Sequence, residues 1–127
     1  MADKNQILQR IKDSVSTTAP GAMLILYGSY ARGEQKAGSD IDLLVLVNQD
    51  SLTYDEEKKI KYPLYHIEYE TGIMISPLVF PKKIWETKHR ITPFYENVIK
   101  EGVVLSDCGD NDVPERQKKE VLMRLDA

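Results

Sequence analysis

Two short apolar runs restrict what this chain can fold into more than any other feature. Residues 23–27 read Met-Leu-Ile-Leu-Tyr and residues 41–47 read Ile-Asp-Leu-Leu-Val-Leu-Val, with a glycine-punctuated stretch between them. A nearly continuous apolar run of this length is typical of a strand in the interior of a sheet, because a strand with a solvated face alternates with polar residues. The sequence therefore predicts two buried strands joined by a turn that begins at Gly28.

Spacing and breakers predict the other elements. Apolar residues recur every three or four positions over residues 2–15 and again over 53–70, which predicts two helices. Pro63 is expected to kink or interrupt the second helix, and Pro77 suits an edge strand or a bulge at 73–80. The remaining expectations are short helices at 81–87 and 94–101, a small strand at 103–105, a loop at 106–113 and a terminal helix at 114–125. Helices alternating with three or four strands predict an α/β sandwich.

Bulk properties favour a small soluble protein of the cytoplasm. A chain of 127 residues suits one domain. The net charge of −3 and the pI of 5.4 provide no basic field for long nucleic acids or membranes. The single cysteine, Cys108, excludes an intramolecular disulfide framework and favours a reducing compartment. No apolar run reaches the roughly 18 residues of a membrane span, and the polar start of the chain does not resemble a signal peptide.

The chemistry of the chain is concentrated around two carboxylates and a glycine turn. Asp40 and Asp42 lie two residues apart at the start of a strand, so both side chains are expected on one face, about 7 Å apart at Cα. Two adjacent carboxylates with no neutralising partner indicate a divalent cation, and oxygen ligands near a phosphate favour Mg²⁺. Gly28 and Ser29 end the preceding strand, where backbone N–H groups and a hydroxyl can meet an anion. Arg32 lies nearby and adds positive charge.

Other phosphate and metal motifs fit the same stretch less well. A P-loop requires Lys followed by Ser or Thr, whereas Lys36 is followed by Ala37. The glycine spacing of a dinucleotide-binding fold is absent. A calcium loop that started at Asp40 would need glycine where the chain has Val45.

The combination of these residues resembles a known superfamily. Gly28-Ser29, Ala31-Arg32-Gly33 and Gly38-Ser39-Asp40-Ile41-Asp42 together are similar to the nucleotidyltransferases related to DNA polymerase β, specifically their minimal (MNT) branch. The resemblance implies a nucleotidyltransferase fold, in which a mixed sheet of about four strands packs against helices on one side. It assigns residues 1–105 to that domain, and residues 106–127 to a loop and helix of the same domain.

The same resemblance implies roles for individual residues. Asp40 and Asp42 would be catalytic and would bind Mg²⁺. The nucleotide, most plausibly ATP, would be held at four positions: Gly28, Ser29, Arg32 and Ser39. Active members place a third carboxylate on the next core strand, where this chain has Ser76. Glu68 and Glu70, just upstream, are the alternatives if that alignment is out of register.

Three functions remain open. The first is transfer of a nucleoside monophosphate, most plausibly AMP, to a hydroxyl of a protein or small molecule. Minimal nucleotidyltransferases are commonly paired with a small helical HEPN protein, so the resemblance implies a role as the antitoxin of a HEPN/MNT pair. The second function, suggested by Ser76, is that of a catalytically impaired protein that acts by contact. The third, RNA modification, is disfavoured by the acidic pI.

Several other side chains have an ordinary structural interpretation beside a functional one. Tyr62, Tyr65 and Tyr69 are expected on a half-buried helix face, with a partner-binding surface as the alternative. Trp85 is expected to anchor a helix to the core rather than to stack on a base. The cationic run is expected to be a solvated face; it comprises Lys82, Lys83, Lys88, His89 and Arg90. His66, His89 and Cys108 receive no role.

Overall fold

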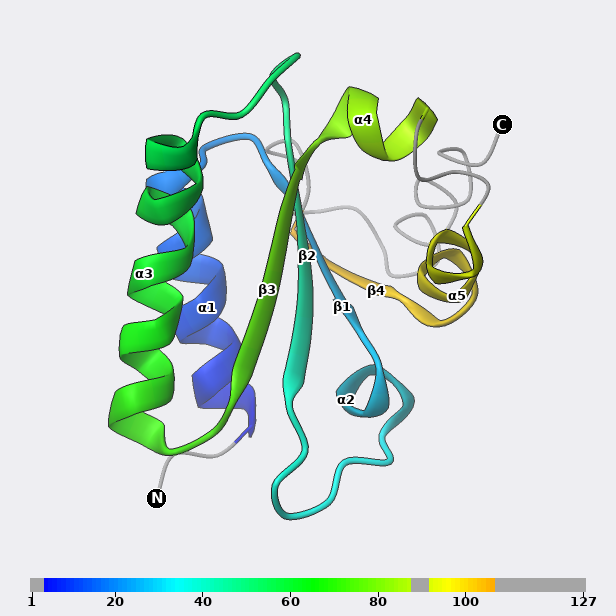
Figure 1. Cartoon of the computed structure of the whole chain (residues 1–127). Coiled ribbons are helices and arrows are strands. Elements are labelled where there is room, and N and C mark those ends of the chain that lie inside the picture. Colours follow the sequence, from blue (N-terminus) through cyan, green and yellow to red (C-terminus); the bar gives the residue numbers. More distant parts are fainter. Residues whose placement is uncertain (1–3, 88–91, 107–127) are drawn as a thin grey trace.

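The computed structural model describes residues 4–87 and 92–106. Its elements in chain order are α1 (Lys4–Thr18), β1 (Met23–Tyr27), α2 (Ser29–Arg32), β2 (Ile41–Val47), α3 (Tyr54–Thr71), β3 (Ile75–Pro81), α4 (Lys82–Thr87), α5 (Pro93–Glu101) and β4 (Val103–Ser106). The strands form one sheet in the order β3-β2-β1-β4 (Figure 1). The expected helix at 114–125 lies outside the described residues, as do Cys108, Lys88, His89 and Arg90.

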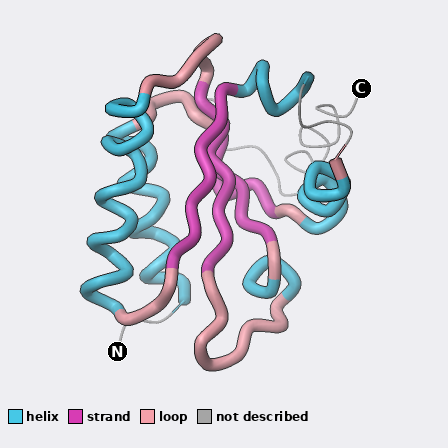
Figure 2. The backbone as a smooth tube through the Cα atoms, in the orientation of Figure 1, coloured by secondary structure: helices cyan, strands magenta, loops and turns pink. Residues whose placement is uncertain are grey.

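The sheet is mixed, as expected for this α/β fold. β1 pairs antiparallel with both β2 and β4, whereas β2 and β3 run parallel. The parallel connection from β2 to β3 runs through α3 (Figure 2). The small strand expected at 103–105 is confirmed as β4. β3 lies at the edge of the sheet, which explains why Pro77 is tolerated there: one side of an edge strand makes no ladder hydrogen bonds.

Helices cover both faces of the sheet, so the expectation of helices on one side only is wrong. α1 and α3 lie on one face, and α4 and α5 lie on the other (Figure 1). Leu24 and Leu26 of β1 join the core beneath α1 and α3, whereas Met23 and Ile25 join the core beneath α4 and α5. A strand that is apolar at every position needs cover on both sides, and the two apolar clusters supply it.

Trp85 anchors α4 to the second of these cores, as predicted. Its side chain is fully buried, and its ring centroid lies 4.8 Å from that of Tyr95 and 5.7 Å from that of Phe94. Phe80 stacks against it at 6.3 Å. These aromatic contacts connect β3, α4 and α5, and they hold the first turn of α5 in a fixed place relative to the sheet.

The long helix α3 departs from expectation in two respects. It is assigned as helix from Tyr54 to Thr71 without a break, although Pro63 lies inside it. A capping box between Thr53 and Glu56 begins the helix, and Gly72 in the left-handed conformation ends it. A buried apolar stripe anchors the helix to the core and consists of Ile60, Leu64 and Ile67. We attribute the unbroken helix to this packing, which offsets the donor lost at proline.

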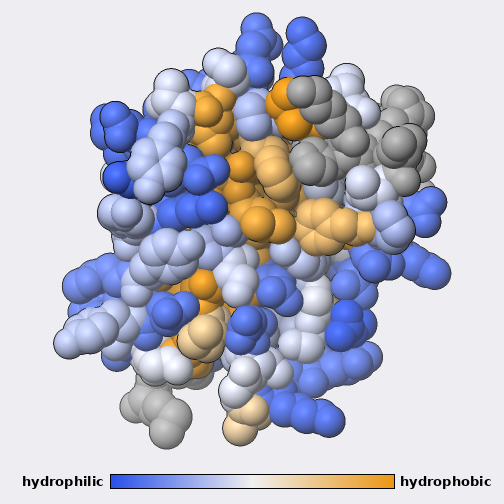
Figure 3. Space-filling model, in the orientation of Figure 1, coloured by the Kyte–Doolittle hydropathy of each residue, from blue (hydrophilic) through white to orange (hydrophobic). Residues whose placement is uncertain are grey.

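The tyrosines of α3 are the second departure. Tyr62, Tyr65 and Tyr69 were expected on a half-buried face, but all three are exposed, and Tyr69 is 86% accessible. They lie opposite the buried stripe of the same helix. The band of apolar colour in the middle of Figure 3 runs instead over the strands, between more polar flanks.

None of the described helices is both long enough and apolar enough to cross a membrane.

Candidate functional site

The two aspartates lie where β2 begins. Asp42 is the second residue of β2, and it is paired with Tyr27 of β1 on one side and with Ser76 of β3 on the other. Because side chains alternate along a strand, Asp42 shares its face with Leu44 and Leu46, which belong to the core beneath α4 and α5. The site is therefore at the end of the sheet, on the face covered by those helices.

The pKa of Asp42 is raised by burial and by neighbouring charge. Burial is the main cause that raises the pKa of Asp42 above its ordinary value, and the negative charge of Asp40 is the second. Arg32 opposes this shift, whereas Glu101 adds to it. Burial also raises the pKa of the paired Tyr27 to about 12, with a further contribution from Asp42. The end of the sheet thus carries an excess of negative charge that a cation would neutralise.

Gly28 brings the glycine turn into contact with this carboxylate pair. Its φ of 76° and ψ of −157° lie in a region that is essentially restricted to glycine. A Cβ atom at this position would lie 2.3 Å from Oδ2 of Asp42. The lack of a side chain therefore lets the backbone of the turn and the carboxylate occupy adjacent space.

The turn also presents backbone donors. The N–H groups of Ala31 and Arg32 both donate to the carbonyl of Gly28, which closes the short helix α2. Within residues 4–87 and 92–106, the N–H groups of Ser29 and Tyr30 have no partner in the protein. Such unpaired donors at the start of a helical turn are what an anion requires. Gly28 and Ser29 thus form the turn that the sequence predicted after the first buried strand.

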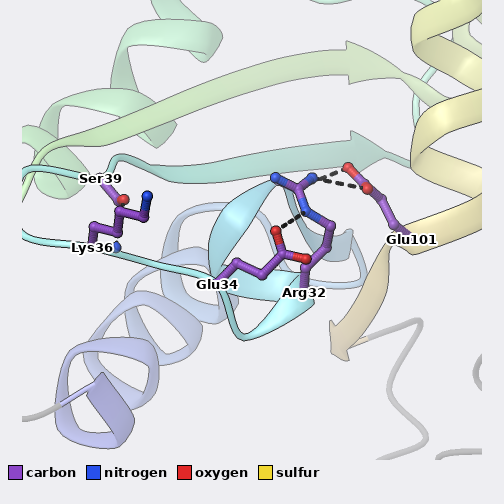
Figure 4. A network of polar contacts seen from close by, with 6 residues as sticks. Arg32, Glu34, Lys36, Ser39 and Glu101 are labelled. Atoms are coloured by element: carbon purple, nitrogen blue, oxygen red, sulfur yellow. Dashed lines mark hydrogen bonds and ion pairs between the residues drawn. The ribbon is translucent and has the colours of Figure 1, made fainter.

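Arg32 is held between two carboxylates that the sequence had not brought together. Its Nη1 donates to Oε2 of Glu101 at 3.0 Å, and its Nε donates to Oε2 of Glu34 at 3.4 Å (Figure 4). The other oxygen of Glu101 accepts a hydrogen bond of 3.3 Å from the N–H of Gly28. Glu101 is therefore a residue of this site that sequence reasoning missed.

The only signal for Glu101 in the sequence was indirect. It is the last residue of α5, directly before Gly102 and β4, and β4 pairs antiparallel with β1. An antiparallel neighbour of β1 begins beside the end of β1, and Gly28 directly follows that end. Without the strand order, nothing in the local sequence distinguishes Glu101 from other helical glutamates.

Ser76 lies in the predicted position on β3. It is the register partner of Asp42, and its hydroxyl donates to Oδ2 of Asp40 at 3.2 Å. The alternative carboxylates are engaged elsewhere: Glu68 accepts from the N–H of Ile75 at 2.7 Å, and Glu70 pairs with Arg10. Serine therefore occupies the position on β3 at which the family resemblance implies a third carboxylate in active members.

Ser39 has a local partner. Its hydroxyl accepts from the N–H of Lys36 at 2.8 Å, and its own N–H donates to the carbonyl of Lys36 at 3.0 Å. These two bonds close the turn that leads into β2; Lys36 and Ser39 are both drawn in Figure 4. The structure thus gives Ser39 a part in shaping the loop before Asp40.

The donor set fits a magnesium ion that is shared with a phosphate. Mg²⁺ is commonly held by one or two carboxylates together with water and phosphate oxygens, and Asp40 and Asp42 supply such a pair. In the part of the chain that the structure describes, no group of three or more His, Cys, Asp or Glu side chains converges to hold a metal ion. The remaining ligands would therefore come from substrate and solvent.

Three described hollows lie away from the aspartates. The first, of about 310 Å³, lies between Ala22, Val47 and Ile60, and the others, of about 450 and 590 Å³, lie beside Lys82 and Pro63. None of these three is lined by Asp40, Asp42 or Gly28. The candidate site is therefore defined by the aspartate pair and by the backbone donors of the Gly-Ser turn rather than by a hollow.

Solved structures with the same fold include nucleotide-bound and toxin–antitoxin complexes. A chain of a toxin–antitoxin complex with AMP-PNP matches with a TM-score of 0.62 at 18% identity, over 93% of this chain and 82% of that one. A chain of the MntA-HpeT toxin–antitoxin, in a form with two aspartates changed to glutamate, gives 0.60 at 14% identity over the same shares. A protein of Shewanella oneidensis gives 0.58 at 12% identity, over 96% and 82%. At these identities the likeness establishes the fold alone.

Sequence relatives are closer. Two proteins of Methanocaldococcus jannaschii, each bearing the name "putative protein adenylyltransferase", are similar to this chain over 82 residues. One is 35% identical, over 62% of this chain and 81% of the relative, and the other is 34% identical, over 65% and 75%. The family model described as "Nucleotidyltransferase domain" matches residues 8–105, which include the Gly-Ser turn, the aspartate pair, β1, β2, β3 and all but the last residue of β4. The chain belongs to the nucleotidyltransferase domain family, in the DNA polymerase β-like superfamily that its motif resembles.

Proposed function

We propose that this protein binds a nucleoside triphosphate with Mg²⁺ and transfers the nucleoside monophosphate, AMP from ATP, to a hydroxyl group of a protein or small molecule. The contact between Gly28 and Asp42 is the observation that carries the proposal. It joins the carboxylate pair to a turn whose N–H groups at Ser29 and Tyr30 have no acceptor among the described residues, so that phosphate and metal would bind side by side. The relatives named as adenylyltransferases and the AMP-PNP complex of the same fold support this choice of reaction.

Each part of the site has a role in this proposal. Asp40 and Asp42 would hold Mg²⁺, while the N–H groups at Ser29 and Tyr30 would receive phosphate oxygens. Arg32 lies beside the turn and would add positive charge to the same phosphates. The hydroxyl of Ser76 keeps Asp40 in place through its hydrogen bond.

The reaction itself is an in-line displacement at phosphorus. The acceptor hydroxyl loses its proton to solvent and its oxygen forms a bond to the α-phosphorus, while the bond from that phosphorus to the bridging oxygen breaks and pyrophosphate leaves with the bonding electrons. A divalent metal held by Asp40 and Asp42 would stabilise the negative charge on the attacking and leaving oxygens. The contribution of this chain is to align the triphosphate between the turn and β2, which raises the rate by positioning.

A helical protein partner follows from the same considerations. Solved structures with the same fold include toxin–antitoxins, and we propose a small HEPN-type protein as the partner and as an acceptor candidate. Three tyrosines on the outer face of α3 offer exposed aromatic surface of the kind that protein interfaces favour; these are Tyr62, Tyr65 and Tyr69. Long nucleic acid remains a poorer substrate for a protein of pI 5.4.

The second candidate is a protein that binds its partner without catalysis. Ser76 favours it, because serine supplies neither a negative charge nor a strong base at the position where active members have a carboxylate. The retained Asp40 and Asp42 pair opposes it, since two adjacent carboxylates are costly without a cation to neutralise them.

Transfer of label separates the two candidates. The purified protein is incubated with Mg²⁺, a candidate acceptor protein and ATP labelled at the α-phosphate, and in parallel with ATP labelled at the γ-phosphate. Our proposal predicts labelling of the acceptor from the α-phosphate only, and its loss in Asp40→Asn. Label from neither position, with an acceptor that still forms a complex with the chain, would favour action by contact.

A further inference from the structure

Glu101 makes two contacts with groups that a phosphate would also use. Its Oε1 accepts from the N–H of Gly28 at 3.3 Å and its Oε2 accepts from Nη1 of Arg32 at 3.0 Å. A backbone N–H at a glycine turn and a nearby guanidinium are the usual pair of ligands for a phosphate oxygen. The carboxylate of Glu101 thus has the position and the charge of an anion bound to the turn.

The location of Glu101 at the end of α5 strengthens this interpretation. It is the last residue of that helix, where the carbonyl groups carry partial negative charge and a carboxylate is disfavoured. It also raises the pKa of Asp42, although burial and Asp40 contribute more. Glu101 therefore lies among like charges, and the two hydrogen bonds to Gly28 and Arg32 compensate for that position.

Glu101 does not complete a metal site with the aspartates. In the described residues, no three His, Cys, Asp or Glu side chains converge enough to hold a cation. Its two oxygens are instead directed to donors on the turn and on α2, as Figure 4 shows for Arg32. Its side chain remains 27% exposed, so it can leave the turn for solvent without unfolding α5.

We propose that Glu101 is a built-in competitor for the phosphate-binding groups of the Gly-Ser turn, which a triphosphate must displace in order to bind. Displacement frees the N–H of Gly28 and the guanidinium of Arg32, which then hold phosphate oxygens in place of the carboxylate. The inference rests on the proposed function, because it concerns the same nucleotide site. Its consequence is that the wild-type protein binds triphosphate more weakly than its donors allow.

Titration calorimetry with ATP and Mg²⁺ on four forms of the full chain tests this inference: wild type, Glu101→Gln, Glu101→Ala and Glu96→Gln. Glu96 belongs to the same helix and is exposed in its first turn, so its variant matches the loss of charge away from the site. We expect Glu101→Gln to bind about tenfold more tightly, the scale of removing one like charge at contact distance from a partly exposed site. Glu96→Gln is expected to bind as the wild type does. Glu101→Ala, which also removes the hydrogen bonds, is expected to tighten binding as well.

The outcomes distinguish this inference from the proposed function. If the wild type binds ATP and Glu101→Gln binds it with equal or lower affinity, the competitor role alone is overturned. A lower affinity would make Glu101 a metal or substrate ligand. Binding by Glu101→Gln when the wild type binds nothing would support the inference. Failure of all forms to bind, with thermal melting showing that each is folded, would overturn both proposals.

Discussion

Gly28 and Asp42 are so close that a Cβ atom on the glycine would lie 2.3 Å from Oδ2 of the aspartate. Asp42 belongs to β2, and Gly28 directly follows Tyr27, the last residue of β1 and the register partner of Asp42. The glycine that shapes the turn is therefore also the glycine that admits the carboxylate. This relationship couples the conformation of the turn to the position of the candidate metal ligand.

Gly28→Ala should consequently damage both folding and binding. The backbone conformation alone costs a residue other than glycine about 1–3 kcal/mol, and the clash with Asp42 adds to it. We expect a loss of at least about 2 kcal/mol in the free energy of unfolding, and loss of nucleotide binding. Denaturant titration and calorimetry measure the two effects.

Gly72→Ala provides the control for that substitution. Gly72 has the same φ of 76° at the end of α3, but a Cβ atom there would meet nothing within 4 Å. Its cost should be limited to about 1 kcal/mol of left-handed backbone strain, with unchanged nucleotide binding. Equal stability and equal binding in the two variants would contradict the account of Gly28.

The raised pKa of Asp42 predicts how stability varies with pH in the absence of metal. In the unfolded state Asp42 loses its proton around its ordinary pKa of 3.8, whereas in the folded state it keeps the proton to a higher pH. As pH rises from about that value through the higher folded pKa, folding therefore becomes less favourable. With EDTA present, the stability of the wild type minus that of Asp42→Asn should decrease across this window. A difference that stays constant or increases would show that the carboxylate is not strained by its surroundings.

Ser76→Asp tests the position on β3. A third carboxylate beside Asp40 and Asp42 should lower stability in EDTA by about 1–2 kcal/mol through like-charge repulsion. Added Mg²⁺ should then raise its melting temperature more than it raises that of the wild type. Ser76→Asn, of similar size but neutral, serves as the control and should show no gain in the magnesium response. An equal response in the aspartate and asparagine variants would remove Ser76 from the site.

The packing of α4 and α5 on the sheet predicts a large effect at Trp85. Its side chain is fully buried against Phe94 and Tyr95, so Trp85→Ala should lower the free energy of unfolding by about 3–5 kcal/mol. Tyr69→Ala, on the exposed face of α3, should change it by less than about 0.5 kcal/mol. Denaturant unfolding of both variants checks the assignment, and similar costs for the two would contradict the described packing.

Local chemistry explains which parts of the site could be predicted from the sequence. Strand periodicity predicted that Ile41 and Asp42 lie on opposite faces, and Ile41 does belong to the core on the other side of the sheet. The family resemblance put Ser76 at the position of the third carboxylate, and the strand register gives it as the partner of Asp42. Glu101 could not be predicted in this way, because it lies 73 residues from Gly28 and reaches it only through the packing of α5 and β4. Tertiary packing likewise explains Pro63, where an apolar stripe holds α3 together through a residue that disfavours helix.

The aspartate pair is the centre of the account, and calorimetric titration with ATP tests it most directly. Wild-type protein and Asp42→Asn are titrated with and without Mg²⁺, after thermal melting has shown that both are folded. We predict binding in the micromolar range by the wild type only when Mg²⁺ is present, and no binding by the variant. Binding that is unchanged in folded Asp42→Asn, or that is independent of Mg²⁺, would contradict the assignment of Asp40 and Asp42 as the metal and nucleotide site.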